Sequence, residues 1–203
     1  MSKYLSRADW GAVPAVKSLP VSKRLKGVCL HYMGFHVNAD DPARLARSIQ
    51  RNHMAKPKEW WDLAYNELIA QDGTVLEGRG LMHRCGANGS TAHNRQYIAI
   101  GLMIGDDQEP SQEMIEAVQE RIQLVRFFQS QATRIVGHSD LKPTSCPGKY
   151  VKALIRAGAF EPTGASPPAI PSIEERLAAL EKRTIDLEGK VCKCPPSSKS
   201  SEP

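Results

Sequence analysis

The segment 137–148 contains the residue types best suited to binding a metal ion. It reads GHSDLKPTSCPG and places His138 and Cys146 eight residues apart. Imidazole and thiolate groups are both good zinc ligands. Pro143 and Pro147 favour turns, so the two side chains can approach each other. Taken alone the pair is a weak signal, because a buried histidine with a hydrogen-bond partner and an inert buried thiol would look the same.

A third metal ligand must come from another part of the chain, and His31 is the best candidate. It ends the apolar run 27–31, which predicts a buried strand, and His138 ends the run 135–138 in the same way. Topology rules allow two such strands to end at one sheet edge, where the imidazoles would meet. Three protein ligands, with Cys146 as the third, leave one zinc position open for water, which is the catalytic arrangement.

The elements predicted around these residues indicate one α/β domain over residues 1–160. Apolar side chains recur at helical spacing in two stretches. Short apolar or alternating runs predict strands, and the Asp72-Gly73 pair between two of them is a strong hairpin signal. The predicted helices cover residues 42–54 and 111–131, and the predicted strands cover residues 27–31, 63–70, 75–77, 97–104 and 135–138.

Composition and charge narrow the class of protein. Hydrophobic residues make up 41% and charged residues 24% of the 203 residues, as in an ordinary globular protein. The net charge of +5 favours polyanionic partners, but no arginine-rich or aromatic-basic stretch marks a nucleic-acid groove, so no nucleic acid partner is expected. No apolar run reaches the ~20 residues that span a membrane. The 5 scattered cysteines form no disulfide framework and favour a reducing compartment.

The C-terminal part of the chain differs in composition from the domain. Residues 161–171 are rich in proline and are predicted to be a linker. Residues 172–192 carry an apolar heptad seam, which predicts a short coiled-coil helix. Residues 193–203 are rich in proline and serine and are predicted to be a disordered tail.

Five motifs in order resemble the type 2 N-acetylmuramoyl-L-alanine amidase family, which includes the peptidoglycan recognition proteins and amidases of phages. The motifs are Ser6–Ala12, Val28–His31, Trp61–Ile69, Asp72–Gly80 and His138–Gly148. The resemblance implies a mixed central β-sheet flanked by helices, with zinc in a cleft on one face.

By resemblance, the metal ligands are His31, His138 and Cys146, the cofactor is Zn²⁺ and the partner is bacterial peptidoglycan. The implied activity is hydrolysis of the amide bond between N-acetylmuramic acid and L-alanine. Zinc lowers the pKa of bound water to about 7 and polarises the scissile carbonyl. Tyr65 and Thr144 are the implied catalytic residues, which donate hydrogen bonds to the oxyanion or orient the water. The sequence names no general acid or base.

Two positions depart from the family pattern. Many relatives have a second histidine directly after the first ligand, where this chain has Tyr32. That neighbour is not a ligand, so the metal site is unaffected. Relatives often have a Gly-Ala-His triplet where this chain reads Gly-Ala-Asn and ends at Asn88. This departure puts the cleft wall at Asn88 in doubt, and His93 is a candidate to compensate.

Several settings for such a domain stay open. The N-terminus has no apolar core of a secretory signal, and a compact amidase of this kind resembles a phage endolysin held in the host cytoplasm until release onto the wall. The alternatives are a non-catalytic peptidoglycan-binding module and a virion-associated wall-degrading protein. Non-catalytic relatives typically lose a zinc ligand, so the presence of Cys146 and Tyr65 favours catalysis.

The heptad helix is expected to form a weak parallel homo-oligomer. In a parallel pair Arg176 meets Glu181 of the other copy, and Arg183 meets Glu188, so each pair is attractive. Three heptads are marginal, and the role of the Cys192/Cys194 pair stays open. Sedimentation is expected to give a dimer or trimer for the full chain and a monomer for a chain ended at residue 164. Two monomers at tens of micromolar would contradict the oligomer and favour a helix that folds back onto its own domain.

Overall fold

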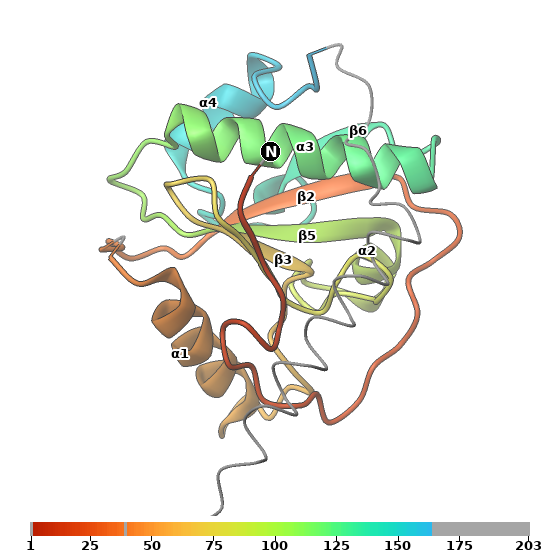
Figure 1. Ribbon diagram of the computed structural model, residues 1–203. Coiled ribbons are helices and arrows are strands. Elements are labelled where there is room, and N and C mark those ends of the chain that lie inside the picture. Colours follow the sequence, from red (N-terminus) through yellow and green to blue (C-terminus); the bar gives the residue numbers. More distant parts are fainter. Residues whose placement is uncertain (1, 39, 164–203) are drawn as a thin grey trace, which may run out of the picture. The chain divides into compact units, whose positions relative to one another are not determined.

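The computed structural model describes residues 2–38 and 40–163 and has an α/β fold (Figure 1). Within these residues one sheet contains β1 (Tyr4–Leu5), β2 (Gly27–Tyr32), β3 (Glu67–Ile69), β4 (Val75–Glu77), β5 (Tyr97–Leu102) and β6 (Arg134–Gly137). The helices are α1 (Pro42–Met54), α2 (Thr91–Gln96), α3 (Gln112–Phe128) and α4 (Lys149–Arg156), with the 3-10 turn η1 at His138–Asp140. The expected mixed sheet flanked by helices is confirmed.

The strand order brings the two histidine-bearing strands together. The strands lie in the order β1-β4-β3-β5-β2-β6. β3 and β4 pair antiparallel, as the hairpin signal predicts, whereas β5, β2 and β6 run parallel to one another. Leu30 of β2 lies opposite Gly137 of β6, so His31 and His138 are the next residues along the two chains. Both histidines therefore reach the same edge of the sheet, as predicted.

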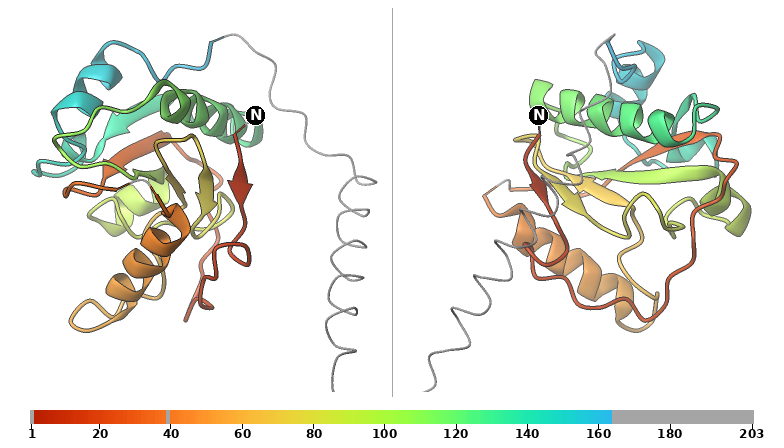
Figure 2. Two further views of the ribbon diagram at one scale, coloured as in Figure 1. Left: turned by 60° about the vertical axis from the view of Figure 1, so that its left-hand side comes forward. Right: turned by 45° about the vertical axis from the view of Figure 1, so that its right-hand side comes forward.

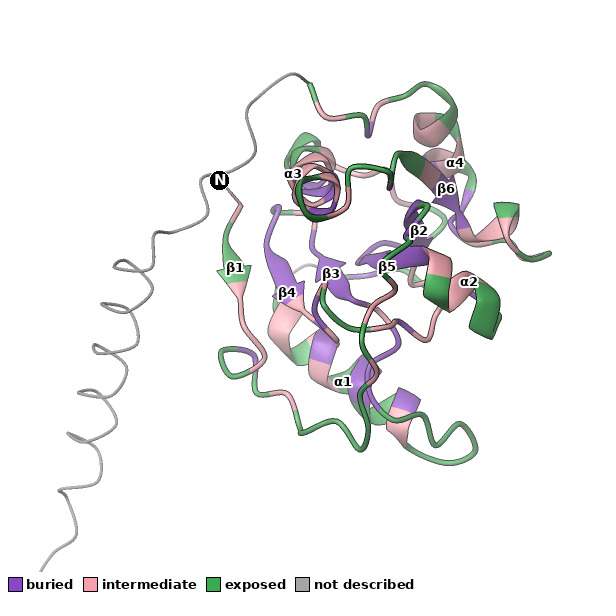
Figure 3. Ribbon diagram, turned by 90° about the vertical axis from the view of Figure 1, so that its right-hand side faces the viewer, coloured by how far each residue is buried: buried purple, intermediate pink, exposed green. Residues whose placement is uncertain are grey.

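Successive side chains of each strand point to opposite faces of the sheet, and each face is covered by helices. Val28 and Leu30 of β2 belong to an apolar cluster with α3, and Leu68 of β3 belongs to another cluster with Ile49 of α1. Figures 1 and 2 show α3 and α4 on one side of the sheet and α1 on the other. The strands between these layers are largely buried (Figure 3). His31 alternates with Leu30 and therefore faces away from α3.

Helix α3 covers its side of the sheet with one apolar face. The Ser111 side chain caps the helix by accepting from the Met114 N–H at 3.0 Å. Each large apolar side chain that the helix buries contributes about 1.5–3 kcal/mol. The buried residues of α3 are Met114, Ala117, Val118, Ile122 and Val125.

The strand expected over residues 63–70 is shorter than predicted and covers Glu67–Ile69, and Asn66, directly before it, bonds to β5 through both its backbone and its side chain. Asn66 Oδ1 accepts from the Ala99 N–H at 2.8 Å, and Asn66 Nδ2 donates to the carbonyls of Gly80 and His83 at 2.8 and 2.7 Å. Regular pairing of β3 with β5 begins only at Glu67. The preceding residues, which carry the predicted catalytic tyrosine, are thereby left outside the sheet.

Most other predicted elements are confirmed, with small changes at their ends. The run 97–104 ends as a strand at Leu102, and the run 135–138 ends at Gly137 because His138 begins η1. The predictions did not include β1, α2 or α4, which are too short to show a clear period in the sequence.

The predictions for the C-terminal part cannot be compared with the structure. The coiled-coil helix 172–192 and the tail 193–203 lie outside the described residues, as does the linker 161–171 from residue 164 onward. The expected oligomer through that helix therefore stays a prediction. Among the helices of the described part, none combines the length and the apolar character needed to cross a membrane.

A buried ion pair ties α3 to β3 and allows a test of the packing. Arg121 Nε donates to Glu67 Oε2 at 2.9 Å, and the Glu67 side chain is 1% exposed. Removing one charge of a buried pair leaves the other uncompensated, so Glu67→Gln is expected to lower the free energy of unfolding by about 3 kcal/mol. Glu161→Gln, which breaks the exposed pair with Arg126, is the matched control and is expected to cost at most ~1 kcal/mol. Equal urea midpoints for the two variants would contradict this account.

Candidate metal centre

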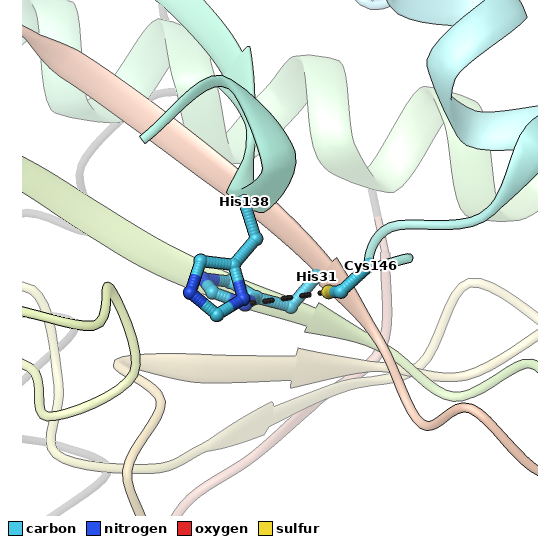
Figure 4. Close-up of side chains that lie close together, drawn as sticks. All are labelled: His31, His138 and Cys146. Carbon is cyan, nitrogen blue, oxygen red and sulfur yellow. Dashed lines mark hydrogen bonds between the residues drawn. The ribbon is translucent and has the colours of Figure 1, made fainter. Parts of the chain in front are cut away.

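Three metal-ligand side chains meet where β2 and β6 end (Figure 4). His31 lies near the end of β2, His138 directly follows β6, and Cys146 comes from the loop before α4. One potential ligand atom from each residue lies within 4.8 Å of the others. The two imidazole centroids are 4.5 Å apart, and Cys146 Sγ lies 3.6 Å from His31 Nδ1. The three predicted ligands therefore form a single cluster.

The loop that carries Cys146 is fastened to the turn η1. The Ser139 N–H donates to the Cys146 carbonyl at 2.9 Å, and the Asp140 carboxylate accepts from the Gly137 N–H at 2.8 Å. A Cβ added to Gly137 would lie 2.8 Å from Pro147 Cδ, so this close approach requires glycine. These contacts hold the thiol in a fixed position relative to the end of β6.

Burial keeps both histidines of the cluster neutral. It lowers the pKa of His31 to about 3, with a further contribution from the nearby His138. The pKa of His138 is also lowered, first by burial and then by Lys142 and His93. A neutral imidazole has a lone pair that can bind a metal. Within the described part of the chain, His138 Nε2 is buried without a hydrogen-bond partner and lies beside Gly89, whereas the other ring nitrogen faces Cys146 (Figure 4).

The thiol completes a donor set that fits zinc. Burial raises the pKa of Cys146 to about 11. Because zinc binds the thiolate, the metal must displace this proton when it binds. Two neutral nitrogens and one thiolate form a three-ligand set that occurs in catalytic zinc sites.

Both predicted catalytic residues adjoin the cluster. The Tyr65 ring packs edge-on against the His31 ring with centroids 5.4 Å apart. Burial raises the pKa of Tyr65, so the phenol stays protonated and can donate a hydrogen bond. Thr144 Oγ1 accepts from the Cys146 N–H at 3.3 Å, which leaves the hydroxyl proton of Thr144 available to another acceptor.

Asn88, the position that departs from the family pattern, contacts the first ligand directly. Its side chain is fully buried, and its Oδ1 lies 2.9 Å from His31 Nε2. His93 contributes its backbone carbonyl to Asn88 Nδ2 at 3.4 Å, and its imidazole helps to lower the pKa of His138, so the expectation that it compensates stays a prediction. The sequence alone gives no signal for the contact with His31, because the two residues come from distant segments.

A groove leads from Tyr65 along α1. A cavity of about 320 Å³ adjoins a second cavity of about 360 Å³, and the two share Phe35, Leu45 and Ser48. Positive charges line the groove. They belong to Arg44, Arg51 and Lys58, and the groove also contains one carboxylate, that of Asp41. The sequence analysis did not single out these residues, although the seven-residue spacing within α1 places the two arginines on one helical face.

Comparison with known proteins agrees with this geometry. The family profile described as N-acetylmuramoyl-L-alanine amidase (Amidase_2) matches residues 21–149. Peptidoglycan recognition protein 1 of Mus musculus is 29% identical over 162 residues, which cover 77% of this chain and 87% of the mouse protein. Peptidoglycan-recognition protein 2 of Holotrichia diomphalia is 31% identical over 150 residues, which cover 71% of this chain and 78% of the beetle protein.

Solved structures share the fold. That of Manduca sexta peptidoglycan recognition protein 1 superimposes with a TM-score of 0.68 at 26% identity, over 76% of this chain and 89% of the other. The segment matched by the family profile includes the whole metal-ligand cluster. This chain therefore belongs to the N-acetylmuramoyl-L-alanine amidase family, with peptidoglycan recognition proteins among its relatives.

Proposed function

We propose that this protein is a zinc-dependent amidase that hydrolyses the bond between N-acetylmuramic acid and L-alanine in bacterial peptidoglycan. One observation carries the proposal. Two imidazoles and a thiol lie within 4.8 Å of one another in a chain of the amidase family. A protein that only binds peptidoglycan does not need this ligand set, so the intact cluster favours catalysis over recognition alone.

The side chains in and around the cluster have separate roles in the proposed reaction. His31, His138 and Cys146 would hold the zinc ion, which would supply a Lewis acid and lower the pKa of a bound water. Tyr65 donates a hydrogen bond to the negative charge that develops on the scissile carbonyl oxygen. The Thr144 hydroxyl orients the attacking water. Hydrolysis adds water across the C–N bond and yields a lactyl carboxylate and the free amine of L-alanine.

The groove along α1 suits the peptide stem of the substrate. Its positive side chains complement the carboxylates of such a stem, and its apolar residues accept the aliphatic parts. The ectodomain complex of peptidoglycan recognition proteins LCa and LCx, at 25% identity and a TM-score of 0.66, has been solved with bound tracheal cytotoxin. The setting proposed from the sequence is that of a phage endolysin, made in the host cytoplasm and acting on the cell wall after release.

Digestion of purified peptidoglycan tests the reaction. New L-alanine amino termini are expected without new reducing sugar ends, because the enzyme cuts an amide and not a glycosidic bond. A chelator should abolish the release of amines, and added zinc should restore it. Cys146→Ala is the matched variant and is expected to be inactive and to bind less metal. Reducing ends without new amines, or full activity of metal-free Cys146→Ala, would overturn the proposal.

Tyr65→Phe separates catalysis from metal binding. Loss of one donor to the oxyanion is expected to reduce kcat about 10²- to 10³-fold. Zinc content, measured by mass spectrometry of the metal, is expected to stay at the wild-type value because the phenol is not a ligand. Thr144→Ala should lose less activity, since water can replace the hydroxyl. A Tyr65→Phe protein that fails to retain zinc would show that the role of this residue is wrong.

Zinc affinity is expected to depend on pH through the thiol. The raised pKa of Cys146, about 11, means that the thiol is protonated at neutral pH and releases its proton on binding. Below that pKa, the apparent Kd should fall about tenfold for each unit by which the pH rises. Calorimetry near pH 6.5 in two buffers of different ionisation enthalpy should count about one proton released per zinc. Release of no proton, or the same release by Cys146→Ala, would exclude the thiol as a ligand.

A further inference from the structure

We propose that Asn88 is a positioning residue that fixes His31 in the tautomer able to bind zinc through Nδ1. The inference rests on the zinc site of the proposed function but concerns metal affinity, not turnover. Asn88 is fully buried, and its Oδ1 lies 2.9 Å from His31 Nε2. His31 is 2% exposed, and the ring nitrogen that meets Asn88 is the one that does not face the thiol.

The surroundings of the Asn88 amide determine which of its atoms faces the histidine. Asn88 Nδ2 lies 3.1 Å from the Tyr97 carbonyl and 3.4 Å from the His93 carbonyl. Both carbonyls can only accept hydrogen bonds, so the NH₂ group must point toward them. The reversed amide would place its oxygen against two carbonyl oxygens. Oδ1 therefore faces His31, and it can only accept.

This orientation determines the proton on His31. Because Oδ1 accepts, His31 Nε2 must carry the hydrogen, and in the neutral ring the lone pair is then on Nδ1. Nδ1 is the atom that lies 3.6 Å from Cys146 Sγ. The opposite tautomer would place a lone pair against Oδ1 and an N–H in the metal position. Histidine ligands in metalloproteins are commonly oriented by such a hydrogen bond from their second nitrogen.

The chain also holds Asn88 itself in place. Its backbone N–H donates to Asn94 Oδ1 at 2.8 Å, and its Nδ2 lies 3.2 Å from Cys85 Sγ. Asn94 belongs to α2, and the Tyr97 carbonyl that orients the amide belongs to the first residue of β5. The loop before α2 therefore helps to orient His31, although it does not line the groove.

Two substitutions test whether Asn88 acts as a hydrogen-bond acceptor for His31 or only packs against it. Asn88→Leu removes the acceptor, and the zinc Kd is expected to rise about 10- to 100-fold. Asn88→Asp keeps an acceptor for Nε2–H, and its second oxygen, once protonated, can still donate to the Tyr97 and His93 carbonyls, so the Kd is expected to stay well below that of Asn88→Leu. Glu161→Gln, which breaks only the exposed pair with Arg126 and touches neither Asn88 nor the metal-ligand cluster, is the control and should leave the Kd unchanged. The Kd is measured by competition with a chromophoric chelator.

A measurement on the wild-type chain tests the proposal independently of how the variants fold. In metal-free protein, ¹⁵N spectra of the imidazoles should show His31 with a protonated Nε2 and an unprotonated Nδ1. An Nδ1–H tautomer, an Asn88→Leu protein that binds zinc as tightly as wild type, or a wild-type chain without zinc affinity would overturn it. Zinc binding with the expected tautomer but without peptidoglycan cleavage would refute the proposed function and leave the role of Asn88 supported.

Discussion

The parallel pairing of β2 with β6 is the constraint on which the metal site depends. Leu30 lies opposite Gly137, so the two strands deliver His31 and His138 to one edge although they are far apart in the sequence. Neighbouring strands are about 4.8 Å apart, and the two rings end 4.5 Å apart, which lets both reach one ion. The Cys146 loop completes the set because it is hydrogen-bonded to the turn that follows β6.

Burial gives these side chains their chemical character. The layer of α3 covers one face of the sheet, and the site lies on residues that alternate away from it. Low exposure lowers the pKa of His31 and raises that of Cys146, so the metal-free cluster holds two neutral imidazoles and a thiol. Such buried polar groups are costly unless they have partners. Asn88 supplies the partner for His31 Nε2, and the proposed zinc ion would bind the three ligand atoms of the cluster.

Binding and chemistry are carried by different elements. The ends of β2 and β6 present the metal ligands, whereas α1 and the segment after it present the positively charged groove. Tyr65 lies at the junction, because it lines the groove and packs against His31. It can do so because the regular pairing of β3 with β5 begins only at Glu67, two residues later. In the proposed function, changes in the groove would therefore alter the choice of peptide without moving the metal-ligand cluster.

The sequence by itself determined the elements with strong local periodicity and the residue types that could bind zinc. The helices α1 and α3 and the β3–β4 hairpin follow from apolar spacing and from one Asp-Gly turn. The motif order indicated the ligands and Tyr65. Only the tertiary structure decided that Asn88 faces His31, that the Asn66 side chain bonds to β5, and that two cavities join along α1. Those features arise from contacts between segments that are far apart in the sequence. Hydrophobic periodicity and secondary-structure propensity are local properties, so they do not determine which side chains of two distant segments come into contact.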